Sequence, residues 1–383
     1  MSNNSRNDQV SSSKLFIWDR KAGRLVGQGA TAQALYGFMD RERDIVTVIS
    51  DEPRAGLKLV ARVSTGEIFE GTPTILISKR RLTAFSREGD QLREYEVEIF
   101  GERELFERHQ GILDGRKLAL KSAVHVGGGT VGATVFDQLL KAGVENHVLI
   151  DPSNFRPQNI SRHLLDLRYL GWPKVKSLEA VAYYRNPSVN INAVQADFTK
   201  LSFIKRRELL ADADLIISST DSNDCEFEAA FTALELGIPF IHIGLHERAK
   251  SGELCFQIPG YTQCCLNCWL GFRKSLPQQE GEALAYSDIP IDMIGRTIAE
   301  PALSVEIGTI VGIAMQWVLA ILMGPGSDRW KNLLDAERNL VLINGSGINE
   351  PLFSEPFQIV RPYLNQELCE LCRSNHEPQQ GKE

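Results

Sequence analysis

The chain has 383 residues, of which 43% are hydrophobic and 24% are charged. That composition is typical of a globular protein, and the length allows two or three domains. The formal net charge of −7 argues against a nucleic-acid partner, because phosphate binding requires a basic surface.

The N-terminal segment is polar. Met1–Asp8 contains no apolar stretch of the kind that a signal peptide requires. We therefore expect a cytoplasmic protein whose cysteines stay reduced and form no disulfides. The polar composition of residues 1–13, and of residues 374–383 at the other end, predicts disordered tails.

Residues 14–104 are predicted to form a small β-rich domain. Short runs of β-branched and aromatic residues alternate there with Gly and Asp turns. The last of these runs faintly resemble the end of JAB/MPN isopeptidase domains, which need a histidine pair on zinc, but residues 1–108 contain no histidine. Any such relationship would be degenerate, and a structural or partner-docking module is the favoured interpretation. The predicted strands begin at Leu15, Ile45, Leu57, Thr74, Leu82 and Tyr95.

A glycine-rich turn follows the first strand of the next region. The apolar run Val124–Val126 leads into Gly127, Gly129 and Gly132, spaced as Gly-x-Gly-x-x-Gly, and a helical pattern then continues until Gly143. Glycines let the backbone turn tightly and approach a ligand, while free N–H groups at a helix start attract phosphate. The pattern predicts a phosphate-binding βα turn.

A second strand, His147–Ile150, ends at Asp151, nineteen residues after Gly132. A carboxylate at that place accepts hydrogen bonds from ribose hydroxyls. Strand, turn, helix, strand and acid together predict a nucleotide site. Taken alone, they fit a nicotinamide or flavin dinucleotide as well as a nucleoside triphosphate.

Fixed cations just beyond the second strand favour the triphosphate. Asn159 and Arg162 form an Asn-x-x-Arg motif, and Gly171 and Lys174 form a Gly-x-x-Lys motif. A dinucleotide fold usually needs no such charges at this point.

A later buried-strand pattern ends in Thr220 and Asp221. The carboxyl end of a strand is where ligands bind in open α/β folds, and a carboxylate there can hold magnesium. Strands and helices alternate around this motif, which predicts a doubly wound sheet. The predicted strands are 189–194, 215–219 and 239–243, the predicted helices are 175–185, 203–211 and 225–236, and a late strand is predicted at 340–345.

Two Cys-x-x-Cys pairs lie far apart in the sequence, Cys265 with Cys268 and Cys369 with Cys372. In a reduced compartment, four thiolates at this spacing suit a tetrahedral structural zinc with no open position. The alternative is a redox pair, which normally occurs singly at a βα turn.

Two further segments separate these pairs. The stretch Lys274–Gly295 is predicted to be a mobile loop. Ile307–Met323 is mostly apolar, but it is short for a membrane span and contains Gln316, so a buried core helix or dimer helix is predicted.

The histidines at 125, 147, 163, 242 and 246 have no ligand spacing and are predicted to be core or surface residues.

These motifs, in this order, resemble the ThiF/MoeB/HesA adenylyltransferases, which share their fold with ubiquitin-activating enzymes. The resemblance covers roughly residues 105–372 and implies a Rossmann-like doubly wound α/β domain over 105–373 that includes the four-cysteine zinc site. Three positions depart from the family pattern. Thr130 stands where the family usually has another glycine, Ser153 replaces the second acid of an Asp-x-Asp, and Ser222 replaces an asparagine.

The resemblance implies ATP- and Mg²⁺-dependent adenylation of the C-terminal carboxylate of a ubiquitin-like, β-grasp protein ending in Gly-Gly, with release of pyrophosphate. It also implies a homodimer in which Arg108 reaches into the partner's nucleotide site, and a crossing-over loop between the cysteine pairs. Arg162, Lys174 and Asp221 would stabilise the reacting phosphates. The implied nucleotide-binding residues are Gly127, Gly129, Thr130, Gly132, Asp151, Asn159, Arg162, Lys174, Asp221 and Ser222.

The acceptor of the activated carboxylate stays open between sulfur transfer, a conjugating enzyme and a peptide. Two other function classes stay open as well, a catalytically inactive scaffold of the same fold and a dinucleotide-dependent oxidoreductase. Cys225 lies near a helix start, where the helix dipole can lower a thiol pKa, but a packed, inert thiol is favoured there. Cys255 and Cys264 are predicted to be structural, with Cys255 in an alternating strand. We therefore expect direct transfer to a partner's nucleophile.

Overall fold

The structure is a computed structural model, and it describes residues 13–19, 22, 33–41, 43, 45–54, 56–64, 67–78, 81–246, 249–275, 302–346, 353–364, 369 and 372. The chain divides into two compact units, Met1–Leu113 with Glu179–Ser188, and Asp114–Leu178 with Val189–Glu383. The predicted disordered tails, except Ser13, and the predicted loop, except Lys274 and Ser275, lie outside the described residues.

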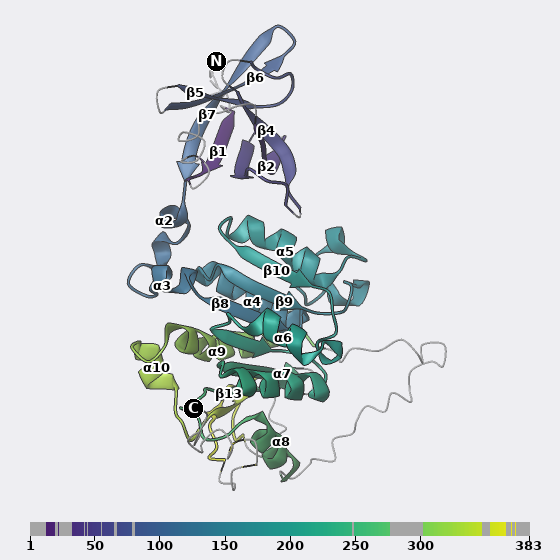
Figure 1. Cartoon of the computed structure of the whole chain (residues 1–383), viewed down its shortest axis with the longest axis vertical. Helices are drawn as coiled ribbons and strands as arrows, with labels where there is room; N and C mark the ends of the chain where they lie inside the picture. Colours follow the sequence, from purple (N-terminus) through teal and green to yellow (C-terminus); the bar gives the residue numbers. More distant parts are fainter. Residues whose placement is uncertain are drawn as a thin grey trace, which may run out of the picture. The chain divides into compact units, whose positions relative to one another are not determined.

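Seven strands of the first unit form a closed barrel (Figure 1). Its strand order is β1-β3-β2-β4-β5-β6-β7, and β1 closes the barrel because it pairs in parallel with both β3 and β7. Closure leaves no unpaired strand edge, and inward-facing side chains such as Leu15, Ile17 and Val48 fill the core. The strands are β1 (Lys14–Trp18), β2 (Gln33–Asp40), β3 (Ile45–Ser50), β4 (Lys58–Ser64), β5 (Thr74–Ser78), β6 (Arg81–Glu88) and β7 (Gln91–Phe100).

Strand β2 is not among the strands predicted from the sequence. Gly37 interrupts its apolar pattern, and the register shifts between Tyr36 and Gly37 in the pairing with β3 and between Leu35 and Tyr36 in the pairing with β4. A Cβ atom at Gly37 would lie 1.8 Å from the carbonyl oxygen of Thr47, so only glycine lets the two strands approach this closely. The interruption that obscured the strand is thus the feature that lets it join the barrel.

An eight-stranded sheet organises the second unit, in the order β10-β9-β8-β11-β12-β13-β14-β15. The first five strands of this order are parallel and the last three pair antiparallel. The predicted doubly wound sheet is therefore confirmed. Its strands are β8 (Ser122–Val126), β9 (Asn146–Ile150), β10 (Asn190–Val194), β11 (Leu215–Ser218), β12 (Phe240–His246), β13 (Ser251–Gln257), β14 (Leu340–Asn344) and β15 (Ile359–Val360).

Helices cover both faces of this sheet. In β13, Gly252 packs against Ile310 of α9, while the next residue, Glu253, faces His242 on the side of α7. Because neighbouring strand residues point to opposite faces, α9 and α7 lie on opposite sides. Among the described residues of both units, the helices are α2 (Glu102–Leu105), α3 (Gly115–Ala119), α4 (Thr130–Ala142), α5 (Lys174–Arg185), α6 (Phe203–Leu210), α7 (Asn223–Leu236), α8 (Leu266–Ser275), α9 (Ser304–Met323) and α10 (Asp328–Leu333), with 3-10 turns η1 (Glu107–His109), η2 (Pro157–Asn159), η3 (Leu167–Tyr169) and η4 (Phe198–Lys200). Of these, α2 and η1 belong to the first unit.

Helix α9 contains the long apolar segment that raises the question of a membrane span. Among the described residues, it is the one helix long and apolar enough to cross a membrane by length and composition, and 56% of its apolar window is buried within the structure. It packs against α4, β12 and β13. The predicted core role of this segment is consistent with that packing.

Strand β13 differs from its predicted alternating pattern, because all seven of its residues are buried. It pairs with β12 on one side and β14 on the other, so neither edge nor face is open to water. Cys255 is accordingly a core residue.

The order of the parallel strands reverses between β8 and β11. From β8 the chain moves outward to β9 and β10, and then returns to β11 on the other side of β8. A reversal of this kind opens a crevice at the carboxyl ends of the two strands, which is where open α/β sheets bind ligands.

Candidate functional site

A cavity of about 440 Å³ lies at this reversal. It is bordered by the segments that follow β8, β9, β10 and β11, together with Leu245 of β12 and Ile307 of α9. All of these residues belong to the second unit.

The glycine turn after β8 is shaped by close backbone contacts. Gly127 has a φ of +106°, which favours glycine, and a Cβ atom there would lie 2.7 Å from the carbonyl oxygen of Ser219. A Cβ atom at Gly132 would lie 2.1 Å from the carbonyl oxygen of Gly127. The first glycine thus makes the turn, and the last lets α4 pack closely on it.

The start of α4 can bind an anion. Its N-cap is Gly129, which has no side chain to accept from the first-turn N–H groups, and Thr130 and Val131 line the cavity. Unsatisfied N–H groups and the positive end of the helix dipole suit phosphate. At the other end of the helix Gly143 adopts the left-handed conformation, as the sequence predicts.

Asp151, at the end of β9, is buried and held by neighbouring donors. One carboxylate oxygen accepts from the Gly128 N–H at 2.7 Å, and the other accepts from the Ser153 N–H at 2.8 Å and from its hydroxyl. Ser153, one of the departures from the family pattern, therefore orients the acid. The carboxylate is fixed at the cavity wall, where it can accept from ribose hydroxyls.

The loop from Ser153 to Lys174 brings two cations to the cavity. It folds back on itself because Phe155 and Gly171 are hydrogen-bonded, and the Lys174 N–H donates to the Ser153 carbonyl at 3.0 Å. Gly171 has a φ of +82°, which suits the turn before α5. Arg162 and Lys174 both line the cavity, together with Asn159.

The turn after β11 contributes an acidic residue, Asp221, to the lining of the cavity. Asp221 is exposed and lines the cavity beside Thr220 and Ser222. Ser222 caps α7 by accepting from the Cys225 N–H at 3.3 Å. Carboxylate and hydroxyl oxygens are donors that magnesium accepts, so this turn fits the predicted magnesium site.

Cys225 also lines the cavity, but it is not an activated thiol. Its side chain is 8% exposed, and burial raises the pKa of Cys225 to about 11. Desolvation therefore outweighs the helix dipole, and the thiol stays protonated near neutral pH.

His163, for which no site role was predicted, supports the glycine turn. Its Nδ1 accepts from the Leu165 N–H at 3.1 Å, so the proton lies on Nε2, which donates to the Gly128 carbonyl at 3.0 Å. Burial lowers the pKa of His163 to about 4, which keeps the ring neutral in this arrangement. His163 and Gly128 are 35 residues apart in the sequence, so no local pattern could have predicted this contact.

A second set of cavity residues was missed by the sequence interpretation. Ala196, Asp197, Phe198 and Thr199, which follow β10, form one wall. The acidic Asp197, just past the end of a parallel strand, is the signal from which this wall could have been found.

Most of the predicted site residues meet at this cavity. Two of the predicted nucleotide-binding and catalytic residues do not line it: Gly132, which has the packing role described above, and Arg108, which is exposed on η1 in the first unit. The predicted residues that line it are Gly127, Gly129, Thr130, Asp151, Asn159, Arg162, Lys174, Asp221 and Ser222.

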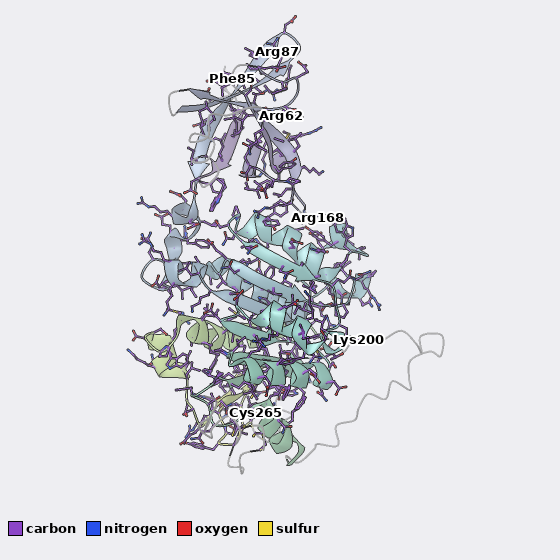
Figure 2. The ribbon with its side chains drawn as sticks, viewed as in Figure 1. Arg62, Phe85, Arg87, Arg168, Lys200 and Cys265 are labelled. Carbon is purple, nitrogen blue, oxygen red and sulfur yellow. The ribbon has the colours of Figure 1, made fainter. Side chains whose placement is uncertain are left out.

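The four predicted metal ligands also come together. The sulfur atoms of Cys265, Cys268, Cys369 and Cys372 lie within 4.8 Å of one another. Cys265, which Figure 2 labels, directly precedes α8. The Cys265–Cys369 and Cys268–Cys372 sulfur distances are both 3.6 Å. Thiolates about 2.3 Å from a tetrahedral zinc would stand about 3.8 Å apart, so the cluster fits that ion.

Comparisons with known proteins find chains of similar sequence and fold. Ubiquitin-like modifier-activating enzyme 5 from Aedes aegypti is 27% identical over 157 residues, which are 39% of this chain and 40% of that protein. The same enzyme from Drosophila melanogaster is 25% identical over 162 residues, 40% of each chain. The matched part therefore spans about two fifths of the length of these relatives.

Solved structures give the same fold. The microcin C7 biosynthetic enzyme MccB in complex with N-formylated MccA superposes with a TM-score of 0.51 at 16% identity, over 67% of this chain and 69% of that one. Escherichia coli MccB with MccA-N7isoASN gives a TM-score of 0.51 at 16% identity, over 67% and 68% of the two chains. Finally, the model of the ThiF family matches residues 102–351, which include the glycine turn, both cations, Asp221 and the first cysteine pair. The chain belongs to the ThiF family.

Proposed function

We propose that this protein adenylates the C-terminal carboxylate of a ubiquitin-like, β-grasp protein at the expense of ATP. The observation that carries the proposal is that Arg162, Lys174 and Asp221 line the same cavity as the glycine turn. Membership of the ThiF family and the likeness to ubiquitin-like modifier-activating enzymes support it.

The cavity suits a nucleoside triphosphate from one end to the other. Along the sheet edge, Asp221 follows β11, the glycine turn follows β8 and Asp151 follows β9. The wall formed by residues 196–199 follows β10. Metal, phosphates, ribose and base would occupy these places in that order. A dinucleotide would not need the two cations, and their presence also disfavours an inactive scaffold.

The reaction joins a carboxylate oxygen to the α-phosphorus and breaks the bond between that phosphorus and the bridging oxygen to the β-phosphate. Pyrophosphate leaves with the electron pair, and an acyl-adenylate remains. Arg162 and Lys174 would neutralise the charge that builds on the phosphate oxygens. Asp221 would hold magnesium, which contributes further charge neutralisation when bound.

The product distinguishes this reaction from ordinary ATP hydrolysis. With ATP, magnesium and the cognate ubiquitin-like protein, we expect pyrophosphate and the acyl-adenylate, which releases AMP when water hydrolyses it; AMP and pyrophosphate are then separated by anion-exchange chromatography. ADP and phosphate as the only products would contradict adenylation.

The activated carboxyl group is expected to pass directly to a partner's nucleophile, either a conjugating enzyme or a sulfur-transfer protein. Cys225 is the one cysteine that lines the described cavity, and its protonated thiol is a poor nucleophile. After incubation with ATP and the substrate protein, non-reducing electrophoresis should show no thiol-sensitive adduct. A band that disappears both with reductant and in Cys225→Ala would make Cys225 the acceptor.

We further propose a homodimer in which Arg108 serves the partner's cavity. If so, Arg108→Ala chains mixed with Lys174→Ala chains should regain part of the lost activity, because each heterodimer contains one intact site. The measurement is pyrophosphate release after mixing, with heterodimers verified by two affinity tags. Activity that stays at the level of the separate variants would exclude this role for Arg108.

A further inference from the structure

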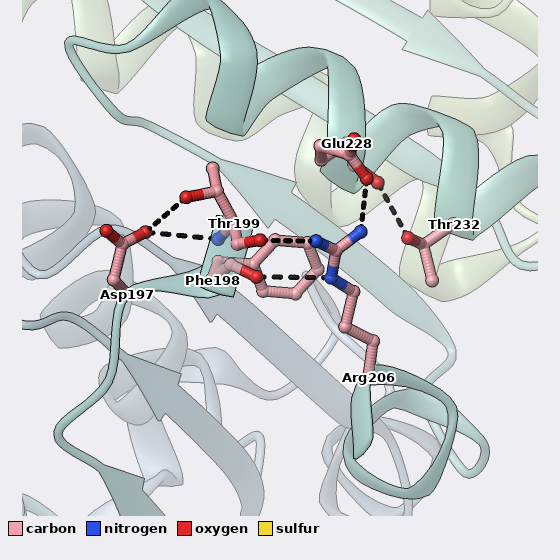
Figure 3. A network of polar contacts seen from close by, with 6 residues as sticks. All are labelled: Asp197, Phe198, Thr199, Arg206, Glu228 and Thr232. Atoms are coloured by element: carbon pink, nitrogen blue, oxygen red, sulfur yellow. Dashed lines mark hydrogen bonds and ion pairs between the residues drawn. The ribbon is translucent and has the colours of Figure 1, made fainter. Parts of the chain in front are cut away.

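One buried arginine joins two walls of the cavity. Arg206 of α6 has a side chain that is 9% exposed, and its guanidinium contacts both η4 and α7 (Figure 3). Nε donates to the Phe198 carbonyl at 3.1 Å, Nη2 donates to the Thr199 carbonyl at 2.9 Å, and Nη1 is paired with Glu228.

The backbone that Arg206 holds is the cavity wall after β10. Asp197 and Thr199 are fixed to each other as well, because Asp197 accepts from the Thr199 N–H at 3.1 Å and from its hydroxyl at 2.7 Å. Glu228, the other partner of Arg206, lies on α7, whose first turn carries Cys225 in the same cavity. The guanidinium therefore ties the Asp197–Thr199 wall to the helix that forms the neighbouring wall.

The chemistry of this contact requires an arginine. Separate N–H groups of one planar guanidinium donate to two carbonyls and a carboxylate. The guanidinium also lies 5.0 Å from the centre of the Phe198 ring. A lysine would keep the charge but would not reach both carbonyls in this geometry. A stabilising role alone does not explain the Arg206–Glu228 pair well, because buried ion pairs often contribute no more to the free energy of unfolding than apolar side chains in their place would.

We propose that Arg206 is a positioning residue that sets the base end of the nucleotide cavity. The inference rests on the proposed function, in which the wall after β10 faces the base. Arg206 does not line the cavity itself, and it acts by holding the backbone of Phe198 and Thr199 in place. Its loss should weaken binding of the nucleoside part of ATP. The phosphate end should be unaffected, because the start of α7 is held by its own cap, in which Ser222 accepts from the Cys225 N–H.

Calorimetric titration of the whole protein with ATP and with inorganic tripolyphosphate, each with magnesium, tests this directly. Arg206→Lys should raise the Kd for ATP about tenfold, the effect of losing one well-aligned charged hydrogen bond. The Kd for tripolyphosphate should not change. Glu228→Ala, at a side chain that is 39% exposed, should fold readily and raise the ATP Kd by about threefold, since it releases Arg206 from α7 only.

Asp214→Asn is the matched control for stability. Asp214 pairs with Lys121 at 2.6 Å and accepts from the Ser122 N–H at 2.9 Å, at the amino ends of β8 and β11, away from the cavity. It should lower the melting temperature without changing either Kd. An unchanged ATP Kd in Arg206→Lys and Glu228→Ala, or an equal loss of tripolyphosphate binding, would overturn the role of Arg206. Failure of the unaltered protein to bind ATP at all would instead refute the proposed function.

Discussion

Lys174→Ala and Asp221→Ala are each expected to lower the exchange of labelled pyrophosphate into ATP by roughly a hundredfold or more. Both side chains line the cavity. In the proposed reaction they lie where the phosphates bind, and the transition state would place added negative charge there. The measurement is exchange with the cognate substrate protein at saturating ATP. Undiminished exchange in either variant would remove that residue from the catalytic machinery.

Lys176→Ala is the matched control for Lys174. It removes a lysine from the same first turns of α5, but that residue is exposed and does not line the cavity. Its exchange rate should remain within about twofold of the unaltered protein, as is usual for surface substitutions. A large loss in this control would show that the helix responds to any substitution, and Lys174 would lose its special role.

Replacement of one cysteine of the metal cluster is expected to unfold or aggregate the protein. The four thiols come from segments on either side of α9, so a bound zinc would join the end of the chain to the α8 region. About one zinc per chain should be found by elemental analysis, and Cys268→Ser or Cys372→Ser should lose both the metal and the cooperative melting transition.

Cys255→Ala provides the comparison for this second prediction. Cys255 is buried, as are three of the four cluster cysteines, but it is not a member of the cluster. Cys255→Ala should lower the melting temperature only slightly, through the lost packing of a small side chain, and should keep the zinc. Absence of zinc from freshly purified, unchelated protein would contradict the structural metal site, and a disulfide within either pair would favour the redox alternative.

The parts of the site that could be predicted from the sequence are those encoded by short patterns. Gly127, Asp151 and Asp221 each stand at the end of an apolar run, and the carboxyl ends of parallel strands meet at one edge of the sheet. The same rule explains why Lys174 was predicted, since its glycine-marked turn lies in the segment that follows β9. The two cysteine pairs were predicted to come together because two Cys-x-x-Cys pairs in one chain are typical of a metal site.

The parts that were missed depend on contacts between distant segments. His163 supports Gly128 through a fold-back of the loop, and Arg206 supports Phe198 from the next helix, so neither has a local pattern. Strand β2 was missed because Gly37 weakens the apparent strand propensity. At Cys225, by contrast, the favoured interpretation of a packed, inert thiol agrees with the structure, where burial raises the pKa of that thiol.

Exchange of labelled pyrophosphate into ATP by the unaltered protein tests the central proposal most directly. Two forms of the cognate ubiquitin-like protein should be compared, one with its free C-terminal carboxylate and one with a C-terminal amide, which cannot attack the α-phosphorus. Label is expected in ATP with the free carboxylate and at background level with the amide. Equal exchange with both forms, or none with either while ATP binds, would contradict adenylation of the C-terminal carboxylate.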